Sequence, residues 1–234
     1  MSIAENVARV RERIRLAASS AGRDPDAITL MGVSKTFPPE SIREAYDSGI
    51  RVFGENRVQE FASKADVLRD LVEARWHLIG HLQSNKAAKA ADLFHAVDSL
   101  DSLKLAEKLN DAARASGKTL RVLVEINVGG EEAKSGVAPD SAELDQLLAQ
   151  APQLASLEFC GLMTVPPYSE DPQGARPFFR KLRELREQIA GRGLPRVNMD
   201  ELSMGMSHDF EVAIEEGSTC VRVGSAIFGN RTKA

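Results

Sequence analysis

The sequence is poor in cysteine, with only Cys160 and Cys220 among its 234 residues. Two cysteines, each inside an apolar run, do not support a scaffold held together by disulfides, and they offer too few thiolates for a structural zinc site. We therefore predict no metal site and interpret both cysteines as small buried side chains.

Long apolar runs are absent as well, because no stretch approaches the roughly 20 apolar residues of a membrane-spanning helix. Near the N-terminus, Ile3, Val7, Val10 and Ile14 recur at helical spacing with charged residues between them. This pattern predicts an amphipathic helix, and it lacks the unbroken apolar centre of a signal peptide. We expect a cytoplasmic protein with no membrane partner.

A large excess of charge of either sign is also missing, since 30 basic and 34 acidic residues leave a net charge of −4. General electrostatic binding to nucleic acid requires a basic surplus, so no nucleic-acid partner is expected. With 43% hydrophobic and 27% charged residues, the chain has the composition of a globular protein and can bury a large core.

Eight short runs rich in β-branched residues alternate with longer segments of helical periodicity. The predicted strands lie in residues 27–35, 51–56, 75–80, 93–99, 121–129, 157–165, 201–207 and 220–229. Eight such units in about 200 residues predict a (β/α)8 TIM barrel of class α/β, with an extra N-terminal helix. An open doubly wound sheet is the alternative, but its Gly-rich fingerprint is missing. Without a linker or repeat, residues 1–234 are expected to form one domain.

Lys35 ends the first predicted strand, directly before a turn with two prolines. In barrels of this kind the active site lies at the carboxyl ends of the strands. An inward-facing lysine that is desolvated or close to another cation loses its proton readily, and the neutral amine can form a Schiff base with an aldehyde. Lys35 is therefore the predicted reactive amine.

The last two units carry small residues at their strand ends. Ser207 directly precedes a helical pattern and is the expected N-cap, while Gly224 and Ser225 follow the last strand. Small residues let backbone N–H groups approach an anion, and the loops after strands seven and eight are the recurrent phosphate site of barrels. Asp209 would oppose a phosphate if its side chain pointed inward.

Strand alternation places Arg222 on the inner face of the last strand, with Val221 and Val223 on the outer face. A buried guanidinium needs acceptors, and two alternatives stay open: an ion pair with a strand carboxylate such as Glu125, or a ligand near the barrel axis. Together with Lys35 and a phosphate site, Arg222 fits a phosphorylated aldehyde such as pyridoxal 5′-phosphate (PLP), whose ring nitrogen it would face.

Six motifs between about Ile28 and Gly229 extend this interpretation. They read "GVSKTFPPE", "FGENRVQE", "WHLIGHLQSNK", "INVGGEEAKSGV", "GLMTVPP" and "LSMGMSHDFEVAIEEGSTCVRVGSAIFG". In this combination the sequence resembles the pyridoxal phosphate homeostasis protein family. The resemblance implies a PLP-binding barrel like the N-terminal domain of alanine racemase, standing alone.

The resemblance also implies the residues of the site. Eight cofactor contacts are expected, namely Lys35, Asn56, Met204, Gly205, Ser207, Arg222, Gly224 and Ser225. Four residues are expected in a second layer, namely His81, Lys134, Met163 and Ser203. Lys134 is equally well explained as a solvated loop charge, and a hydrogen-bonded structural role is favoured for His77 and His81.

The resemblance implies a carrier or buffer that holds PLP as a Schiff base for vitamin B6 homeostasis, with no catalytic residue. A racemase needs two acid–base groups on opposite faces of the substrate carbon. In the resembling racemases the second group comes from an additional β domain, which these 234 residues do not contain. We therefore expect a monomer that is not an enzyme and contacts PLP-requiring apo-enzymes transiently.

Two alternatives to a carrier remain. A low-activity PLP-dependent amino-acid racemase stays open because Tyr168 lies near a strand end and could reach the site. A Schiff-base aldolase without cofactor is the other, and Lys134 is its one candidate for a second lysine.

Overall fold

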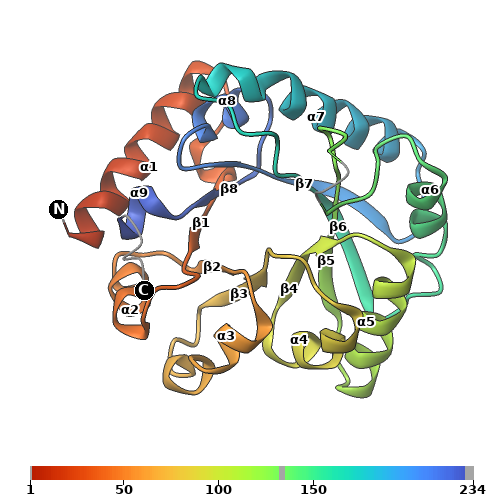
Figure 1. The fold of residues 1–234 in the computed structure, drawn as a ribbon. Coiled ribbons are helices and arrows are strands. Elements are labelled where there is room, and N and C mark those ends of the chain that lie inside the picture. The colour runs from red at the N-terminus through yellow and green to blue at the C-terminus, as the bar shows by residue number, and fades with distance from the viewer. Residues whose placement is uncertain (1, 132–134, 230–234) are drawn as a thin grey trace.

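The computed structural model describes residues 2–131 and 135–229 and contains a closed barrel of eight parallel strands in sequence order (Figure 1). The strands are β1 (Thr29–Val33), β2 (Val52–Glu55), β3 (Arg75–Leu78), β4 (Ala96–Leu100), β5 (Leu120–Glu125), β6 (Leu157–Met163), β7 (Val197–Met206) and β8 (Cys220–Val223). Pairing of β1 with β8 closes the barrel, with Met31 opposite Arg222. The predicted TIM barrel is confirmed, and the open doubly wound sheet is excluded.

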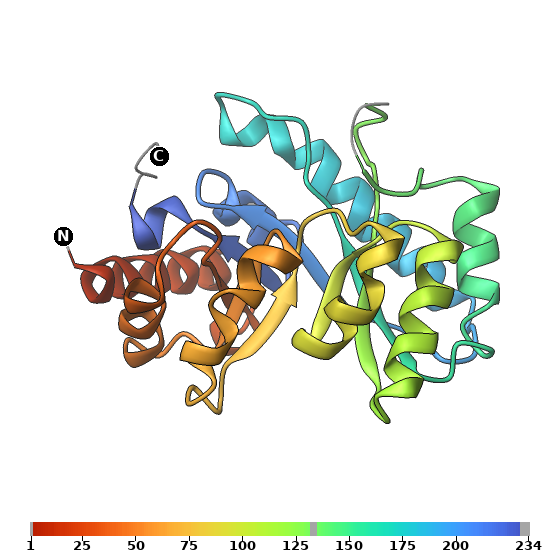
Figure 2. The same ribbon diagram turned by 60° about the horizontal axis from the view of Figure 1, so that its bottom comes forward.

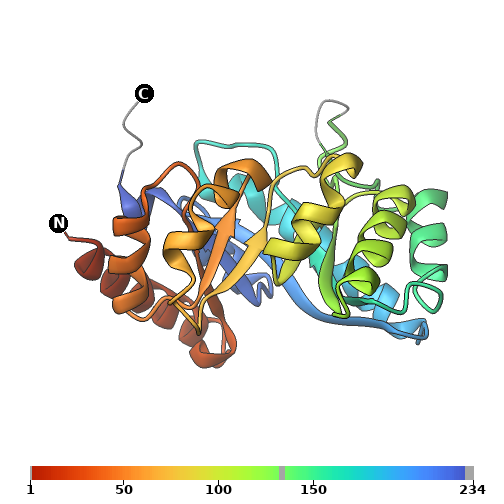
Figure 3. The same ribbon diagram turned by 90° about the horizontal axis from the view of Figure 1, so that it is seen from below.

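Helices surround the barrel, as the side views in Figures 2 and 3 also show. They are α1 (Ile3–Ser20), α2 (Pro39–Asp47), α3 (Val58–Ala62), α4 (Ala87–Leu93), α5 (Leu103–Ala115), α6 (Ala142–Ala149), α7 (Arg176–Gly191), α8 (Phe210–Glu215) and α9 (Ser225–Phe228). Within the described residues, short 3₁₀ helices add η1 (Pro25–Ala27), η2 (Ala65–Leu68), η3 (Ser84–Lys86) and η4 (Pro172–Ala175). In residues 2–131 and 135–229, no helix is both long and apolar enough to span a bilayer.

The predicted N-terminal helix is present as α1. A capping box starts it, because Ser2 Oγ accepts from the Glu5 amide and the Glu5 carboxylate accepts from the Ser2 amide. Its apolar face, including Val10 and Ile14, is buried against α2, α8 and α9. The helix therefore covers the seam at which the first and last units of the barrel meet (Figures 1 and 2).

Both cysteines are buried and free, as predicted. Burial chiefly raises the pKa of the Cys160 thiol to about 11 and that of Cys220 to about 12. Thiols with such high pKa values stay protonated near neutral pH and are poor nucleophiles. They act here as small apolar side chains.

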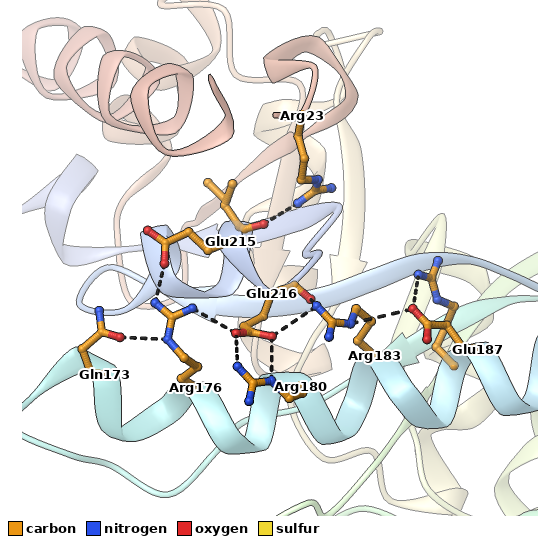
Figure 4. Close-up of polar contacts among 10 residues, drawn as sticks. Arg23, Gln173, Arg176, Arg180, Arg183, Glu187, Glu215 and Glu216 are labelled. Carbon is orange, nitrogen blue, oxygen red and sulfur yellow. Dashed lines mark hydrogen bonds and ion pairs between the residues drawn. The ribbon is translucent and has the colours of Figure 1, made fainter. Parts of the chain in front are cut away.

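An arginine clamp, made of Arg176, Arg180 and Arg183 of α7, closes on Glu216 at the end of α8 (Figure 4). Their nitrogens lie 2.9, 3.0 and 3.2 Å from the Glu216 carboxylate oxygens, and Glu216 is only 4% exposed. Burial alone would raise the pKa of Glu216, but the arginine hydrogen bonds outweigh it and hold the pKa below its ordinary value. The clamp thus fixes α8, and with it the loop before α8, against α7.

Replacing Glu216 with glutamine is expected to lower the free energy of unfolding by about 2–3 kcal/mol, because three guanidinium groups lose their shared carboxylate. Because its pKa is lowered on folding, Glu216 stabilises the protein above its unfolded-state pKa, and this contribution is lost as the pH falls through the folded-state pKa. Urea unfolding at neutral and acidic pH measures both effects. The control is Glu187→Gln, an exposed partner of Arg183, and equal losses in both variants would contradict the clamp.

Candidate functional site

A cavity of about 330 Å³ opens at the carboxyl ends of the strands. Six of the eight predicted contact residues line it, namely Lys35, Asn56, Ser207, Arg222, Gly224 and Ser225. These residues come from both ends of the chain, and closure of the barrel brings them together. The structure thus gathers most of the predicted site at one opening, while their binding roles stay predictions.

Lys35 enters the cavity because it continues the inward alternation of β1. Val33 and Lys35 line the cavity, whereas Ser34 between them is fully buried. Lys35 Nζ donates to Asn56 Oδ1 at 3.3 Å, so the amine lies beside the end of β2. The alternation of residues at the end of β1 therefore directs the Lys35 side chain into the cavity.

The prediction that Ser207 caps the following helix is wrong. Asp209 occupies the N-cap position of α8, and two residues of turn separate Ser207 from that helix. Ser207 Oγ instead accepts from the amides of Gly224 at 3.2 Å and Ala226 at 3.3 Å. Its hydroxyl therefore joins the loop after β7 to the start of α9.

Asp209 closes the same turn with its carboxylate, which accepts from the Met206 amide at 2.7 Å. It is 8% exposed, and burial chiefly raises its pKa. The predicted conflict between Asp209 and an anion depends on an inward-pointing carboxylate. In the structure, Asp209 Oδ1 is hydrogen-bonded to the Met206 amide of the same turn.

Three backbone amides at the cavity have no acceptor within the described part of the chain, those of Ser207, His208 and Ser225. Folded proteins seldom leave amides without an acceptor, so such a group points to water or a ligand. Gly224 precedes Ser225 and also lines the cavity, and the three atoms nearest to a Cβ built there all belong to Val33, at 3.5 Å or more. We call these three N–H groups, together with Gly224, the anion cradle, because the sequence predicts an anion site in these two loops.

Arg222 is held by uncharged acceptors. One guanidinium nitrogen donates to Ser203 O at 2.6 Å and Ser203 Oγ at 2.8 Å, and the other to Thr164 O at 2.7 Å. Its side chain is 3% exposed, and burial lowers its pKa. Among the ion pairs of the described residues none joins Arg222 to Glu125, so the predicted ion-pair alternative is not realised. A fixed positive charge therefore borders the cavity.

Not every predicted residue reaches the cavity. Met204 and Met163 are fully buried in the core. Gly205 adopts a left-handed conformation with φ +93°, and a Cβ there would lie 2.6 Å from Ala213 Cβ. The backbone conformation and this close approach therefore explain why a glycine stands at this position. Ser203 supports Arg222, as expected of a second layer, and Lys134 lies outside the described residues.

His77 and His81 are both hydrogen-bonded, as predicted. His77 Nδ1 lies 3.0 Å from Asp98 inside the barrel, and His81 Nδ1 lies 3.0 Å from Asp101. His81 is more than half exposed and does not line the cavity. A further cavity of about 450 Å³ adjoins His77 at the opposite mouth of the barrel and holds none of the predicted contacts.

The cavity also has an apolar wall that was not predicted from the sequence, formed by Val33, Phe37, Ile79, Val165 and Met206. Phe37 stacks on Phe228 with ring centroids 4.9 Å apart. Strand alternation could have found Val33, two residues before Lys35. Phe37 had no such signal, because its direction follows from the turn after β1.

Comparisons with known proteins agree with this geometry. Residues 3–232 match the family described as alanine racemase, N-terminal domain. The pyridoxal phosphate homeostasis protein of Aquifex aeolicus is 48% identical and is covered over 99% of both chains. That of Pseudomonas aeruginosa is 44% identical over 98% of this chain and 96% of its own. The structure of PipY from Synechococcus elongatus with PLP bound is 37% identical, with a TM-score of 0.84 over 97% of this chain and 100% of PipY.

Glu125 ends β5 with an unsatisfied carboxylate. It is 9% exposed, and its buried Oε2 accepts no hydrogen bond from any residue in 2–131 or 135–229. Burial, helped by the charge of Asp101, raises its pKa to about 7, although Arg222 and His81 act in the opposite direction. A titratable group near neutral pH therefore lies in the same barrel as Arg222.

Replacing Glu125 with glutamine is expected to change how stability depends on pH. The folded-state pKa lies above the ordinary value of 4.5, so folding opposes ionisation and the protein loses stability as the pH rises from about 4.5 to about 7. Glu125→Gln should therefore gain about 2–3 kcal/mol at pH 8 and little at pH 4.5. Urea unfolding at both pH values, with exposed Glu107→Gln as control, measures this; a gain that does not depend on pH would refute the assignment.

Proposed function

The chain belongs to the family of pyridoxal phosphate homeostasis proteins, within the wider alanine racemase N-terminal domain family, and on this premise we propose that it binds PLP at Lys35 as an intracellular carrier or buffer. One observation carries the proposal: a single cavity joins a lysine amine, three unpaired amides and an arginine that is held by uncharged oxygens. PipY, a relative with the same fold, has a structure with PLP bound, which supports the same ligand here.

The residues of the cavity match the parts of PLP in chemistry. When bound, PLP supplies an aldehyde that amines attack, an anionic phosphate and a pyridine nitrogen. Lys35 Nζ would form a carbon–nitrogen double bond with the aldehyde carbon, and the aldehyde oxygen would leave as water. The amides of Ser207, His208 and Ser225 would hold the phosphate, and Gly224 leaves room for it.

Arg222 would act on the ring nitrogen through its charge. Because Ser203 and Thr164 hold the guanidinium rigidly, its positive charge cannot move away from the cavity. A nearby cation disfavours a second positive charge, so the ring nitrogen would stay unprotonated. An unprotonated ring withdraws electrons poorly, which favours storage of the cofactor over chemistry at a substrate carbon.

A carrier is also favoured over a racemase by the position of Tyr168. This residue is 81% exposed at the rim of the cavity, with its ring centroid 6.0 Å from that of His208. A racemase needs acid–base groups held firmly on opposite faces of the reacting carbon. We propose a cytoplasmic monomer without catalytic turnover that contacts PLP-requiring apo-enzymes transiently.

Borohydride reduction of the protein incubated with PLP is expected to leave one pyridoxyl group, on Lys35. Peptide mass spectrometry locates the group, and Lys35→Ala should lose it along with the absorbance of the bound cofactor. Label spread over surface lysines, with none at Lys35, would refute the proposal. Amino-acid racemisation by the wild-type protein that disappears in Lys35→Ala would establish the enzyme alternative.

Gly224→Ala is expected to weaken PLP binding roughly tenfold or more while leaving stability nearly unchanged. A Cβ at this position makes only ordinary contacts with the protein, so it fills the anion cradle without straining the fold. Titration with PLP and with pyridoxal, which lacks the phosphate, separates the two parts of the ligand. The control is Gly191→Ala, where a Cβ meets nothing within 4 Å; equal weakening for pyridoxal would contradict the cradle.

A further inference from the structure

A buried polar network lies behind β1, on the side of the strand opposite to the cavity. Ser34 and Glu55 are both fully buried, and Ser34 Oγ donates to Glu55 Oε1 at 2.6 Å. The next residue pair, Lys35 and Asn56, forms its own hydrogen bond on the cavity side. Side-chain hydrogen bonds therefore join the ends of β1 and β2 on both faces of the sheet. Lys35 itself makes the bond on the cavity face.

Lys64, which follows α3, connects this network to a second carboxylate. Its Nζ donates to Glu60 Oε1 at 2.7 Å and to Ser34 O at 3.4 Å, and lies 3.5 Å from Glu55. Burial chiefly raises the pKa of Glu55. Burial also acts to raise the pKa of Glu60, but hydrogen bonds from Lys64 and the Thr36 amide outweigh it and lower that pKa. Glu60 is therefore the ionised partner of Lys64.

Thr36, directly after Lys35, has a strained backbone. Its φ of +69° lies in the left-handed region, which a β-branched residue adopts at a cost of about 1–3 kcal/mol. The Thr36 amide donates to Glu60 Oε1 at 2.5 Å, and the Phe37 amide donates to Ser34 O at 3.1 Å. A strained backbone conformation persists only where the surrounding structure holds it. At Thr36, the Glu60 carboxylate holds it through the hydrogen bond from the Thr36 amide.

We propose that Glu60, anchored by Lys64, is a positioning residue that fixes the backbone on either side of Lys35 and so directs Nζ toward Asn56 in the cavity. This inference rests on the proposed function, because it assigns the control of the PLP-binding lysine to a group behind the strand. The acceptor oxygen matters more than the charge, since it receives the hydrogen bonds of both Thr36 and Lys64. Without the Glu60 oxygen, Thr36 relaxes to negative φ and the Lys35 side chain no longer points toward Asn56.

The test compares Glu60→Ala with Glu60→Gln, in which an amide oxygen can still accept from the Thr36 N–H. Stopped-flow absorbance at saturating PLP gives the rate constant for covalent attachment to Lys35. We expect a loss of roughly tenfold or more in Glu60→Ala and a largely retained rate in Glu60→Gln, because small misplacements of a reacting group are costly. Glu40→Ala, an exposed acid in the first turn of α2, is the matched control and should keep the wild-type rate.

A second readout needs no PLP. Hydrogen–deuterium exchange should show faster exchange at the Thr36 amide in Glu60→Ala than in wild-type protein or Glu60→Gln. Adding Thr36→Gly to Glu60→Ala should recover part of the attachment rate, since glycine adopts positive φ without this cost. If Glu60→Ala does not fold, Lys64→Met replaces it, with the same two measurements and the same expected direction.

The outcomes separate this inference from the proposed function. Failure of wild-type protein to attach PLP at Lys35 refutes the proposed function, whatever the variants do. Normal attachment in wild-type protein and in folded Glu60→Ala, at equal rates, overturns the positioning role alone. Equal losses in Glu60→Ala and Glu60→Gln also overturn it, because the acceptor oxygen would then not be the group that matters.

Discussion

The parallel pairing of β1 with β8 joins the first and last units of the barrel, and the candidate site depends on it. Met31 lies opposite Arg222, so the chain beyond β1 and the chain beyond β8 emerge side by side. Lys35 from one end of the sequence thereby shares a cavity with Gly224 and Ser225 from the other. The Lys35 amine and the unpaired amides of the two loops could contact one ligand only because this pairing closes the barrel.

The charged group beside the candidate site, the Arg222 guanidinium, is bonded to oxygens that carry no charge. Arg222 donates three hydrogen bonds, to one hydroxyl and two carbonyl oxygens, and these uncharged acceptors do not remove its positive charge. Glu216 shows the opposite solution, because three arginines neutralise it in a region away from the cavity. Glu216 is therefore paired directly with opposite charges between two helices, whereas Arg222 beside the cavity is bonded directly only to uncharged oxygens.

The sequence was sufficient to predict the barrel and most of the residues near its opening, because alternation and chain order decide which residues reach the opening. The strand ends were less well predicted, since β8 ends at Val223 and residues 225–228 of the predicted last strand form α9. Details that depend on local register were not predictable. The ladder between β7 and β8 shifts between Ser203 and Met206, so Met204 packs in the core and Met206 lines the cavity. Ser207 was assigned to the wrong helix because its preference for the amides of α9 arises only when the two loops meet.

Helix α1, which precedes the eight strand–helix units, helps to hold α9 in place. The Asn6 side chain donates to Ile227 O at 2.8 Å, and Asn6 is 8% exposed, so α1 holds the short α9 from outside the barrel. Ser207 holds the start of the same helix from the cavity side. A four-residue helix has little stability of its own, so the cradle formed by Gly224 and Ser225 keeps its shape because two distant segments hold α9 in place.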